Sequence, residues 1–271
     1  MGELRQIVGI VLVKNEDRFV GRAVRNIAAF CDSMLLCDNG SCDSTLGILK
    51  ELADEFSHAE LHSISHPSVS HDLLKRFAAT PTWVFAVDGD EIYDPVRLAG
   101  FRVRVLSGEF DGLWRIKGNV LHCTWLSEDG VRARGYLATP SRSITKLYNF
   151  GVIQSWDGDT VERLHGGKVV FQSGFDDLKK LNFQESISWD ETPLRCLHTC
   201  FLRRSSLDED GGVRENIMEV YRGGITGTLR RIGNRLRGRV TESKWKKHHY
   251  RQGDEVMLDT SVFFSGSGSF E

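Results

Sequence analysis

Hydrophobic runs alternate with helix-spaced apolar residues over the first hundred positions of the chain. The apolar runs typical of buried strands are residues 7–13, 33–37, 59–64 and 83–87. The segments between them that carry apolar residues at helical spacing are 17–30, 46–56 and 69–79. This alternation predicts an α/β fold in which a mostly parallel central sheet is flanked by helices.

The pattern changes from residue 100 onward. Strand-like runs separated by polar loops, with little helical periodicity, are residues 112–125, 142–150, 167–173 and 194–202. Beyond residue 213 the composition changes again, and segment 221–251 is rich in Arg and Lys with Glu242 as its only acid. We therefore predict a domain over 1–212, built of the halves 1–98 and 99–212, and a basic, helical C-terminal extension over 213–271.

Composition narrows the class of protein. The chain has 271 residues, 40% hydrophobic and 27% charged, and its net charge of −2 gives no general attraction to nucleic acid. No apolar run reaches the length of a membrane span, the N-terminus lacks the pattern of a signal peptide, and the six cysteines contain no C-x-x-C pair. These features predict a cytoplasmic protein. The basic segment 221–251 either packs back on the domain or contacts an anionic acceptor, a carrier or the inner membrane face.

Acidic residues follow two of the predicted strands. Asp38 closes the run 33–37, and Asp88, Asp90 and Glu91 follow the run 83–87. Parallel strands bring their carboxyl ends to one edge of a sheet, where ligands bind. Clustered carboxylates repel one another and lose hydration there unless a cation or a proton neutralises them. The sequence therefore predicts a ligand site with a bound cation at this edge.

Three stretches together resemble the nucleotide-binding half of family 2 glycosyltransferases. They are VGIVLVKNEDRFVGRAVRNI, LLCDNGSCDST and WVFAVDGDE. In that family a first strand ends near Asn-Glu, a second ends in Asp-x-Gly-Ser-x-Asp and a fourth ends in Asp-x-Asp-Glu. The resemblance covers roughly residues 5–95. It implies a GT-A (nucleotide-diphospho-sugar transferase) fold, a nucleotide-sugar donor, a divalent cation and inversion at the anomeric carbon, with 1–98 as the nucleotide-binding half and 99–212 as the acceptor half.

The resemblance also assigns donor-binding residues. Asp38 should accept a hydrogen bond from the nucleobase, and a carboxylate facing an imide N–H suits uracil or thymine; of these we favour a UDP-sugar. Asp38 could instead cap the turn before Gly40. Arg76 could reach the diphosphate or simply form a surface ion pair. The complete predicted nucleotide-binding set is Val13, Asn15, Glu16, Asp38, Arg76, Asp88 and Gly89.

A Mn²⁺ or Mg²⁺ ion held by hard carboxylate oxygens can bridge two phosphates and stabilise the charge of the leaving group. Asp90 is the expected main ligand, and Asp88 faces the ribose or a metal-bound water. His198 resembles a late histidine that helps to hold the metal or diphosphate in many GT-A enzymes. It could also be a packed core histidine, or a zinc ligand beside Cys196 and Cys200 on one face of a strand. Arg203 and Arg204 could help to bind phosphate or face solvent.

Inverting transfer needs a general base for the acceptor hydroxyl. The stretch SWDGDTVERL resembles a Gly-x-x-His-Glu region of related small transferases, which places Glu162 at the position of the acid and Val161 at that of the histidine. Glu162 is the first candidate base, and Asp190 or Glu191 in SWDE are the alternatives.

The predicted function is a metal-dependent inverting glycosyltransferase that moves a hexosyl or related sugar onto an unidentified sugar, metabolite or carrier-linked acceptor. A nucleotidyltransferase is an alternative, but VLVKNEDRF lacks the glycines of a phosphate loop. A catalytically inactive GT-A-fold binding protein is another. The enzymatic prediction requires that the acidic side chains face a cavity and are not held by ion pairs with Lys and Arg.

Overall fold

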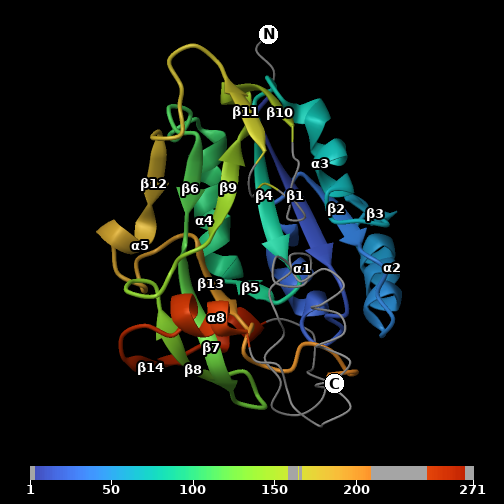
Figure 1. Cartoon of the computed structure of the whole chain (residues 1–271), viewed down its shortest axis with the longest axis vertical. Coiled ribbons are helices and arrows are strands. Elements are labelled where there is room, and N and C mark those ends of the chain that lie inside the picture. The colour runs from blue at the N-terminus through green and yellow to red at the C-terminus, as the bar shows by residue number, and fades with distance from the viewer. Residues whose placement is uncertain (1–3, 158–163, 165–166, 209–242, 266–271) are drawn as a thin grey trace.

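The computed structural model describes residues 4–157, 164, 167–208 and 243–265. Within these residues the strands form a seven-stranded sheet, a five-stranded sheet and a two-stranded ribbon (Figure 1). No helix in the described ranges has the length and apolar character needed to cross a membrane.

The seven-stranded sheet has the order β12-β6-β9-β4-β1-β2-β3. Its strands are β1 (Gln6–Val13), β2 (Ser33–Asp38), β3 (Ala59–Ser63), β4 (Thr82–Asp88), β6 (Arg115–Lys117), β9 (Thr145–Asn149) and β12 (Lys180–Asn182). The pairs β1–β2, β1–β4 and β2–β3 are parallel, whereas β9 is antiparallel to both β4 and β6. The four strands predicted in the first hundred residues are therefore confirmed, and so is their parallel arrangement.

Helices cover the sheet because the side chains of each strand alternate between two cores. On β1, Ile7 and Val11 belong to one hydrophobic cluster and Val8 and Ile10 to another. The first cluster includes residues of α1 (Val20–Ala28), α2 (Thr45–Glu55) and α4 (Pro95–Leu106). The second includes Leu74 of α3 (Val69–Leu74), which a 3-10 turn (Lys75–Phe77) continues. Helices thus pack on both faces of the sheet.

Helix α4 was not predicted, because residues 95–106 span the point at which the periodic pattern changes. Its start has a clear local cause. The Asp94 carboxylate accepts hydrogen bonds from the backbone N–H groups of Val96 and Arg97, both at 3.0 Å, and Pro95 occupies the first turn. Both features are strong helix-start signals.

The five-stranded sheet has the order β14-β8-β7-β13-β5 and lies below the larger sheet in Figure 1. Its strands are β5 (Glu91–Tyr93), β7 (Asn119–Leu126), β8 (Arg132–Leu137), β13 (Arg195–His198) and β14 (Glu255–Asp259). Strands β8 and β14 were not predicted. The predicted strand 112–125 is divided between β6 and β7 at Gly118, where a Cβ would lie 2.2 Å from the Leu194 carbonyl oxygen. The second half of the chain thus contains mixed strands, as expected.

The described part of the basic C-terminal segment packs on this second sheet. It forms α8 (Lys244–Tyr250), β14 and α9 (Ser261–Phe264), and Phe263 is fully buried. The Asn26 amide donates a hydrogen bond to the Phe263 carbonyl at 2.8 Å, which joins α1 to the end of the chain. The remaining elements are the antiparallel ribbon of β10 (Ile153–Asp157) and β11 (Lys168–Phe171), a 3-10 turn (Phe150–Val152) and α5 (Phe183–Ser186).

Candidate active site

The carboxyl ends of β1, β2 and β4 meet at one edge of the large sheet. Val13 on β1 pairs with Asp38 on β2, and Leu12 pairs with Asp88 on β4. Strands β1 and β4 run side by side toward this edge (Figure 1). The sheet register therefore brings the ends that carry the predicted acidic residues together, and we call this region the carboxyl edge.

The turn between β4 and β5 holds three acidic side chains around one glycine. A Cβ at Gly89 would lie 2.6 Å from the Val13 Cγ1 atom and 2.5 Å from the Glu16 Oε2 atom. Residue 89 must therefore lack a side chain for β1 and its following loop to pack against the turn. Asp90 and Glu91 on its far side are each only 1% exposed.

Side-chain cations neutralise this buried acidic cluster. The Arg204 Nη1 atom lies 2.5 Å from Asp90 Oδ2 and 2.9 Å from Glu16 Oε1. The Lys146 Nζ atom on β9 lies 2.7 Å from Glu91 Oε1 and 3.0 Å from Asp88 Oδ2. The requirement that Lys and Arg do not pair with these carboxylates is thus not met in the described residues, and sugar transfer at this site would require a bound cation and diphosphate to replace the ion pairs of Asp88 and Asp90. The cost of clustering the carboxylates is offset by cations from the second half of the chain.

The environments of these groups shift their protonation in different directions. Burial raises the pKa of Asp90, but the charges of Arg204 and His198 outweigh burial and hold this pKa well below its usual range. Burial, opposed by Lys146, raises the pKa of Glu91 to about 7. Burial, together with the charge of Arg204, lowers the pKa of Lys246 on α8. Asp90 therefore keeps its negative charge within the cluster.

A pair of histidines extends the cluster from Asp90 toward α8. His122 Nε2 lies 2.8 Å from the Arg142 carbonyl oxygen, which can only accept, so this nitrogen carries a proton. Burial and the charge of His198 hold the pKa of His122 well below its usual range, so His122 Nδ1 is the acceptor for His198 Nδ1 at 2.9 Å. His198 Nε2 in turn lies 3.6 Å from Asp90 Oδ2. Burial lowers the pKa of His198, but Cys200 and Asp90 outweigh burial and raise it to about 10.

Asp38 has the geometry of a turn cap. Its buried carboxylate accepts hydrogen bonds from the backbone N–H groups of Gly40 at 3.1 Å and of Ser41 at 3.2 Å. The Asn15 side-chain oxygen accepts one from the Cys42 N–H at 2.7 Å, and Asn15 itself has a positive φ of 54°. The hydrogen bonds of Asp38 and Asn15 therefore fix the loop after β2, which lies beside the end of β1.

A short loop after β13 ties the acidic cluster to the first half of the chain. Besides the Arg204 ion pairs, Ser205 Oγ donates a hydrogen bond to Asp43 Oδ2 at 2.5 Å, and Ser206 N–H donates one to Asp17 Oδ1 at 2.7 Å. Arg204 was recognisable in the sequence as a phosphate-binding candidate. Lys146 and His122 were not, because nothing in their local sequence signals that strand pairing places them beside Glu91 and His198.

Several predicted residues lie away from this cluster. Arg76 is exposed in the turn that leads into β4, at the opposite end of that strand from Asp88, and its guanidinium lies over the Phe77 ring. Asp190 is exposed and pairs at 3.2 Å with Arg195, which begins β13, whereas His198 ends it. Glu191 is exposed and accepts a hydrogen bond from Ser188 Oγ at 2.8 Å. Glu162 lies outside the described residues.

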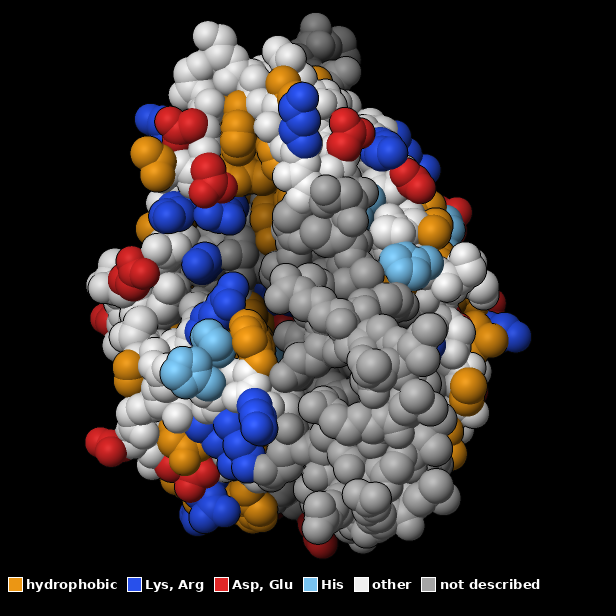
Figure 2. Space-filling model, viewed as in Figure 1, with side chains coloured by type: hydrophobic (Ala, Val, Ile, Leu, Met, Phe, Trp, Pro, Cys, Tyr) orange, Lys and Arg blue, Asp and Glu red, His pale blue; other side chains and the backbone are white. Residues whose placement is uncertain are grey.

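Basic side chains gather beside the site. Burial, followed by the nearby charges of Arg115, Arg142 and Lys180, lowers the pKa of Lys117 on β6. Figure 2 shows Lys and Arg side chains clustered over β6, β12 and α8. Lys117 pairs with Thr145 on β9, next to Lys146, so this basic surface adjoins the acidic cluster.

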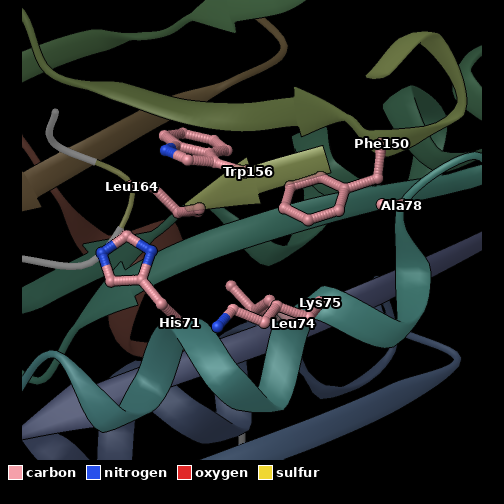
Figure 3. Close-up of a pocket in the computed structure, with 7 residues that line it drawn as sticks. All are labelled: His71, Leu74, Lys75, Ala78, Phe150, Trp156 and Leu164. Atoms are coloured by element: carbon pink, nitrogen blue, oxygen red, sulfur yellow. The ribbon is translucent and has the colours of Figure 1, made fainter. Parts of the chain in front are cut away.

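A separate cavity between α3 and β10 is lined by His71, Leu74, Lys75, Ala78, Phe150, Trp156 and Leu164 (Figure 3). Its volume of about 10 Å³ is at most enough for one water molecule. This cavity therefore cannot hold a nucleotide or a sugar.

Comparisons with known proteins give only weak similarities. No protein-family model and no curated protein matches it. One similar solved structure is glucosyl-3-phosphoglycerate synthase from Mycobacterium tuberculosis in complex with phosphoglyceric acid, at 22% identity over 44% of each chain and a TM-score of 0.32. Another is a mannosyltransferase from Pyrobaculum calidifontis in complex with GDP-Man and Mn²⁺, at 15% identity over 54% of this chain and 45% of that one, with a TM-score of 0.35. The chain thus matches less than half the length of these proteins, and membership of family 2 stays a prediction.

Proposed function

We propose that this protein is a glycosyltransferase of the GT-A type that transfers a sugar from a nucleoside diphosphate donor, with UDP-sugars favoured. The observation that carries the proposal is the convergence of two kinds of group at the carboxyl edge. Strand ends supply Asp38, Asp88 and Asp90, and the second half of the chain supplies Lys146 and Arg204. Nucleotide recognition and diphosphate neutralisation need both kinds of group together.

The donor set suits a hard divalent cation. Carboxylate oxygens are the preferred protein ligands of Mg²⁺ and Mn²⁺. The Asp88 side chain is 39% exposed, which makes it the accessible ligand, whereas Asp90 is buried and would share its carboxylate with Arg204. In this proposal Asp88 and Asp90 hold the ion and His198 orients Asp90. A bound ion would supply Lewis acidity toward the leaving diphosphate.

The chain's own residues have three tasks in this reaction. Asp38, fixed by the turn that it caps, presents a carboxylate edge to the N–H of the base. Arg204 and Lys146 hold the acidic side chains in place and, together with Lys246, provide positive charge where the diphosphate leaves. Buried cations of this kind act in a low local dielectric, so their effect on developing charge is larger than in water.

On the acceptor side, Glu162 remains the proposed general base, since Asp190 and Glu191 lie at the other end of β13 from His198. Glu91 is a positioning residue in this scheme, because its two carboxylate oxygens contact Lys146 and the Asp88 backbone N–H. The basic surface around Lys117 supports an acceptor that carries negative charge, such as a phosphorylated sugar or carrier.

The proposal is tested by incubating the full chain with a panel of nucleotide sugars and Mn²⁺ and measuring the released nucleotide by mass spectrometry. We expect one donor to be hydrolysed slowly, and Asp90→Asn to abolish the release. Asp54→Asn, which changes an exposed carboxylate on α2, is the matched control and should keep the wild-type rate. Glu162→Gln should still bind the donor but turn it over about 100-fold or more slowly. Release that survives in Asp90→Asn would contradict the assignment.

The ion pairs of the acidic cluster also favour a second candidate, a nucleotide-sugar-binding protein without transferase activity. Its carboxylates would remain bound to Lys146 and Arg204 rather than to a metal. The same panel separates the two: a donor that is retained intact on the protein, with no release for any sugar or acceptor, supports the binding protein.

A further inference from the structure

A second group of metal-ligating side chains lies behind Asp90. The group consists of His122, His198 and Cys200, which are all buried. Each residue offers one ligand atom, and these three atoms lie within 4.8 Å of one another. His122 and His198 are directly paired in register on the parallel strands β7 and β13, and Cys200 follows in the next turn. The structure therefore brings His122 beside His198 and Cys200, although His122 lies 76 residues before His198 in the sequence.

The outer contacts of the two histidines resemble those of metal ligands. Histidine ligands usually donate their second ring N–H to a carbonyl or a carboxylate, which fixes the tautomer and the ring orientation. His122 Nε2 donates to the Arg142 carbonyl at 2.8 Å, and His198 Nε2 faces the Asp90 carboxylate at 3.6 Å. Both Nδ1 atoms consequently point at each other and toward the interior of the cluster.

A small movement would bring the two histidines to coordination distance. The two Nδ1 atoms lie 2.9 Å apart. Zn–N bonds of about 2.05 Å in a tetrahedral site place two nitrogens about 3.3 Å apart, so a shift of about 0.4 Å is enough. The ring of Tyr250 on α8 stacks on His122 with centroids 4.1 Å apart and meets His198 edge-on at 5.4 Å. This aromatic side chain covers the cluster and limits exchange with solvent.

We propose that His122, His198 and Cys200 form a Zn²⁺ site that is distinct from the carboxylate site of Asp88 and Asp90. A soft thiolate and two imidazole nitrogens suit zinc, whereas Mg²⁺ and Mn²⁺ prefer oxygen ligands. Binding displaces the protons from His198 Nδ1 and from the Cys200 thiol. The ion ties β7 to the end of β13, and the Thr199 N–H, which donates to the Asp90 carbonyl at 2.8 Å, connects this turn to the acidic cluster. The sequence had suggested Cys196 as a partner, but His122 takes that place.

The first test measures metal in the full-length protein, without any assay of transfer. The purified chain should contain one equivalent of zinc by elemental mass spectrometry. After chelation and reloading with Co²⁺ under reducing conditions, it should show tetrahedral visible bands and a thiolate-to-cobalt charge-transfer band in the near ultraviolet. Excess Mg²⁺ or Mn²⁺ should not displace the ion.

Variants then locate the site. Cys200→Ser should remove the charge-transfer band, and His122→Asn should weaken Zn²⁺ binding by more than the roughly 10–100-fold cost of a lost outer partner. Cys196→Ser, which alters another buried cysteine two residues from His198, is the matched control and should keep stoichiometry and spectrum. Wild-type protein that takes up no Zn²⁺ and gives no thiolate band would overturn the proposal, and so would equal loss in Cys196→Ser. Neither result bears on the sugar transfer, which depends on Asp88 and Asp90.

Discussion

Ion pairs at the two ends of the large sheet have the same chemistry but opposite environments. Near the amino ends of the strands, Arg104 pairs with Glu109 on side chains that are 46% and 44% exposed. At the carboxyl edge, Lys146 pairs with Glu91 on side chains that are 4% and 1% exposed. Exposed pairs contribute about 0–1 kcal/mol to stability, whereas the desolvation of a buried pair costs several kcal/mol per ion. A fold that buries Glu16, Asp90 and Glu91 with their cations at one edge therefore maintains them for a purpose other than stability.

The largest effect that this comparison predicts comes from removing a buried cation. Lys146→Met removes the cation that lies between Glu91 and Asp88, and we expect the free energy of unfolding to fall by about 3–5 kcal/mol. Urea denaturation measures this change. The matched variant Arg104→Met should change stability by less than about 1 kcal/mol. Similar small losses in both variants would mean that the two ends of the sheet do not differ as described.

The second effect concerns the close packing of the acidic turn. Gly89→Ala places a methyl group against Val13 and Glu16, and overpacking of this kind typically costs about 1–3 kcal/mol. The same variant should weaken nucleotide binding because it moves Asp88 and Asp90. Gly47→Ala on α2 is the control, since nothing lies within 4 Å of its added Cβ, and it should stabilise the protein by about 0.5–1 kcal/mol. A stable Gly89→Ala protein with unchanged nucleotide affinity would contradict the packing argument.

The smallest effect concerns the helix that carries Lys246. The Ser243 hydroxyl caps α8 by accepting a hydrogen bond from the Lys246 N–H at 3.1 Å. Ser243→Ala should cost about 1 kcal/mol. Ser44 precedes α2 without a side-chain cap bond, so Ser44→Ala should leave thermal stability nearly unchanged. If both variants melt together with the wild type, α8 is not an integral part of the fold.

The sequence predicted the strands and helices of the first hundred residues well because the strands are long apolar runs that alternate with amphipathic helices. It predicted the second half less well for physical reasons. Strand β14 reads EVMLD, and its alternation of exposed and half-buried residues leaves too few apolar positions for a clear signal. Helix α4 carries its start signal in Asp94-Pro95, but its apolar positions begin where the regular alternation of strand and helix patterns in the sequence ends.

The residues of the candidate site likewise fall into two groups, one that the sequence predicts and one that it does not. Asp38, Asp88 and Asp90 were predictable because each follows a strand whose end is fixed by its own sequence. Their cations were not, since Lys146 reaches Glu91 only through the pairing of β9 with β4, and no local pattern encodes that register. Long-range strand pairing thus determines which cations neutralise the carboxylates, while local sequence determines where the carboxylates lie.

Calorimetric titration of the full chain with UDP and Mn²⁺ measures whether the carboxyl edge binds a nucleoside diphosphate. We expect binding in roughly the micromolar to millimolar range, weakened at least about tenfold in Asp38→Asn and in Lys246→Met. Absence of binding for UDP, GDP and dTDP alike, or equal affinity in the wild type and both variants, would contradict this expectation.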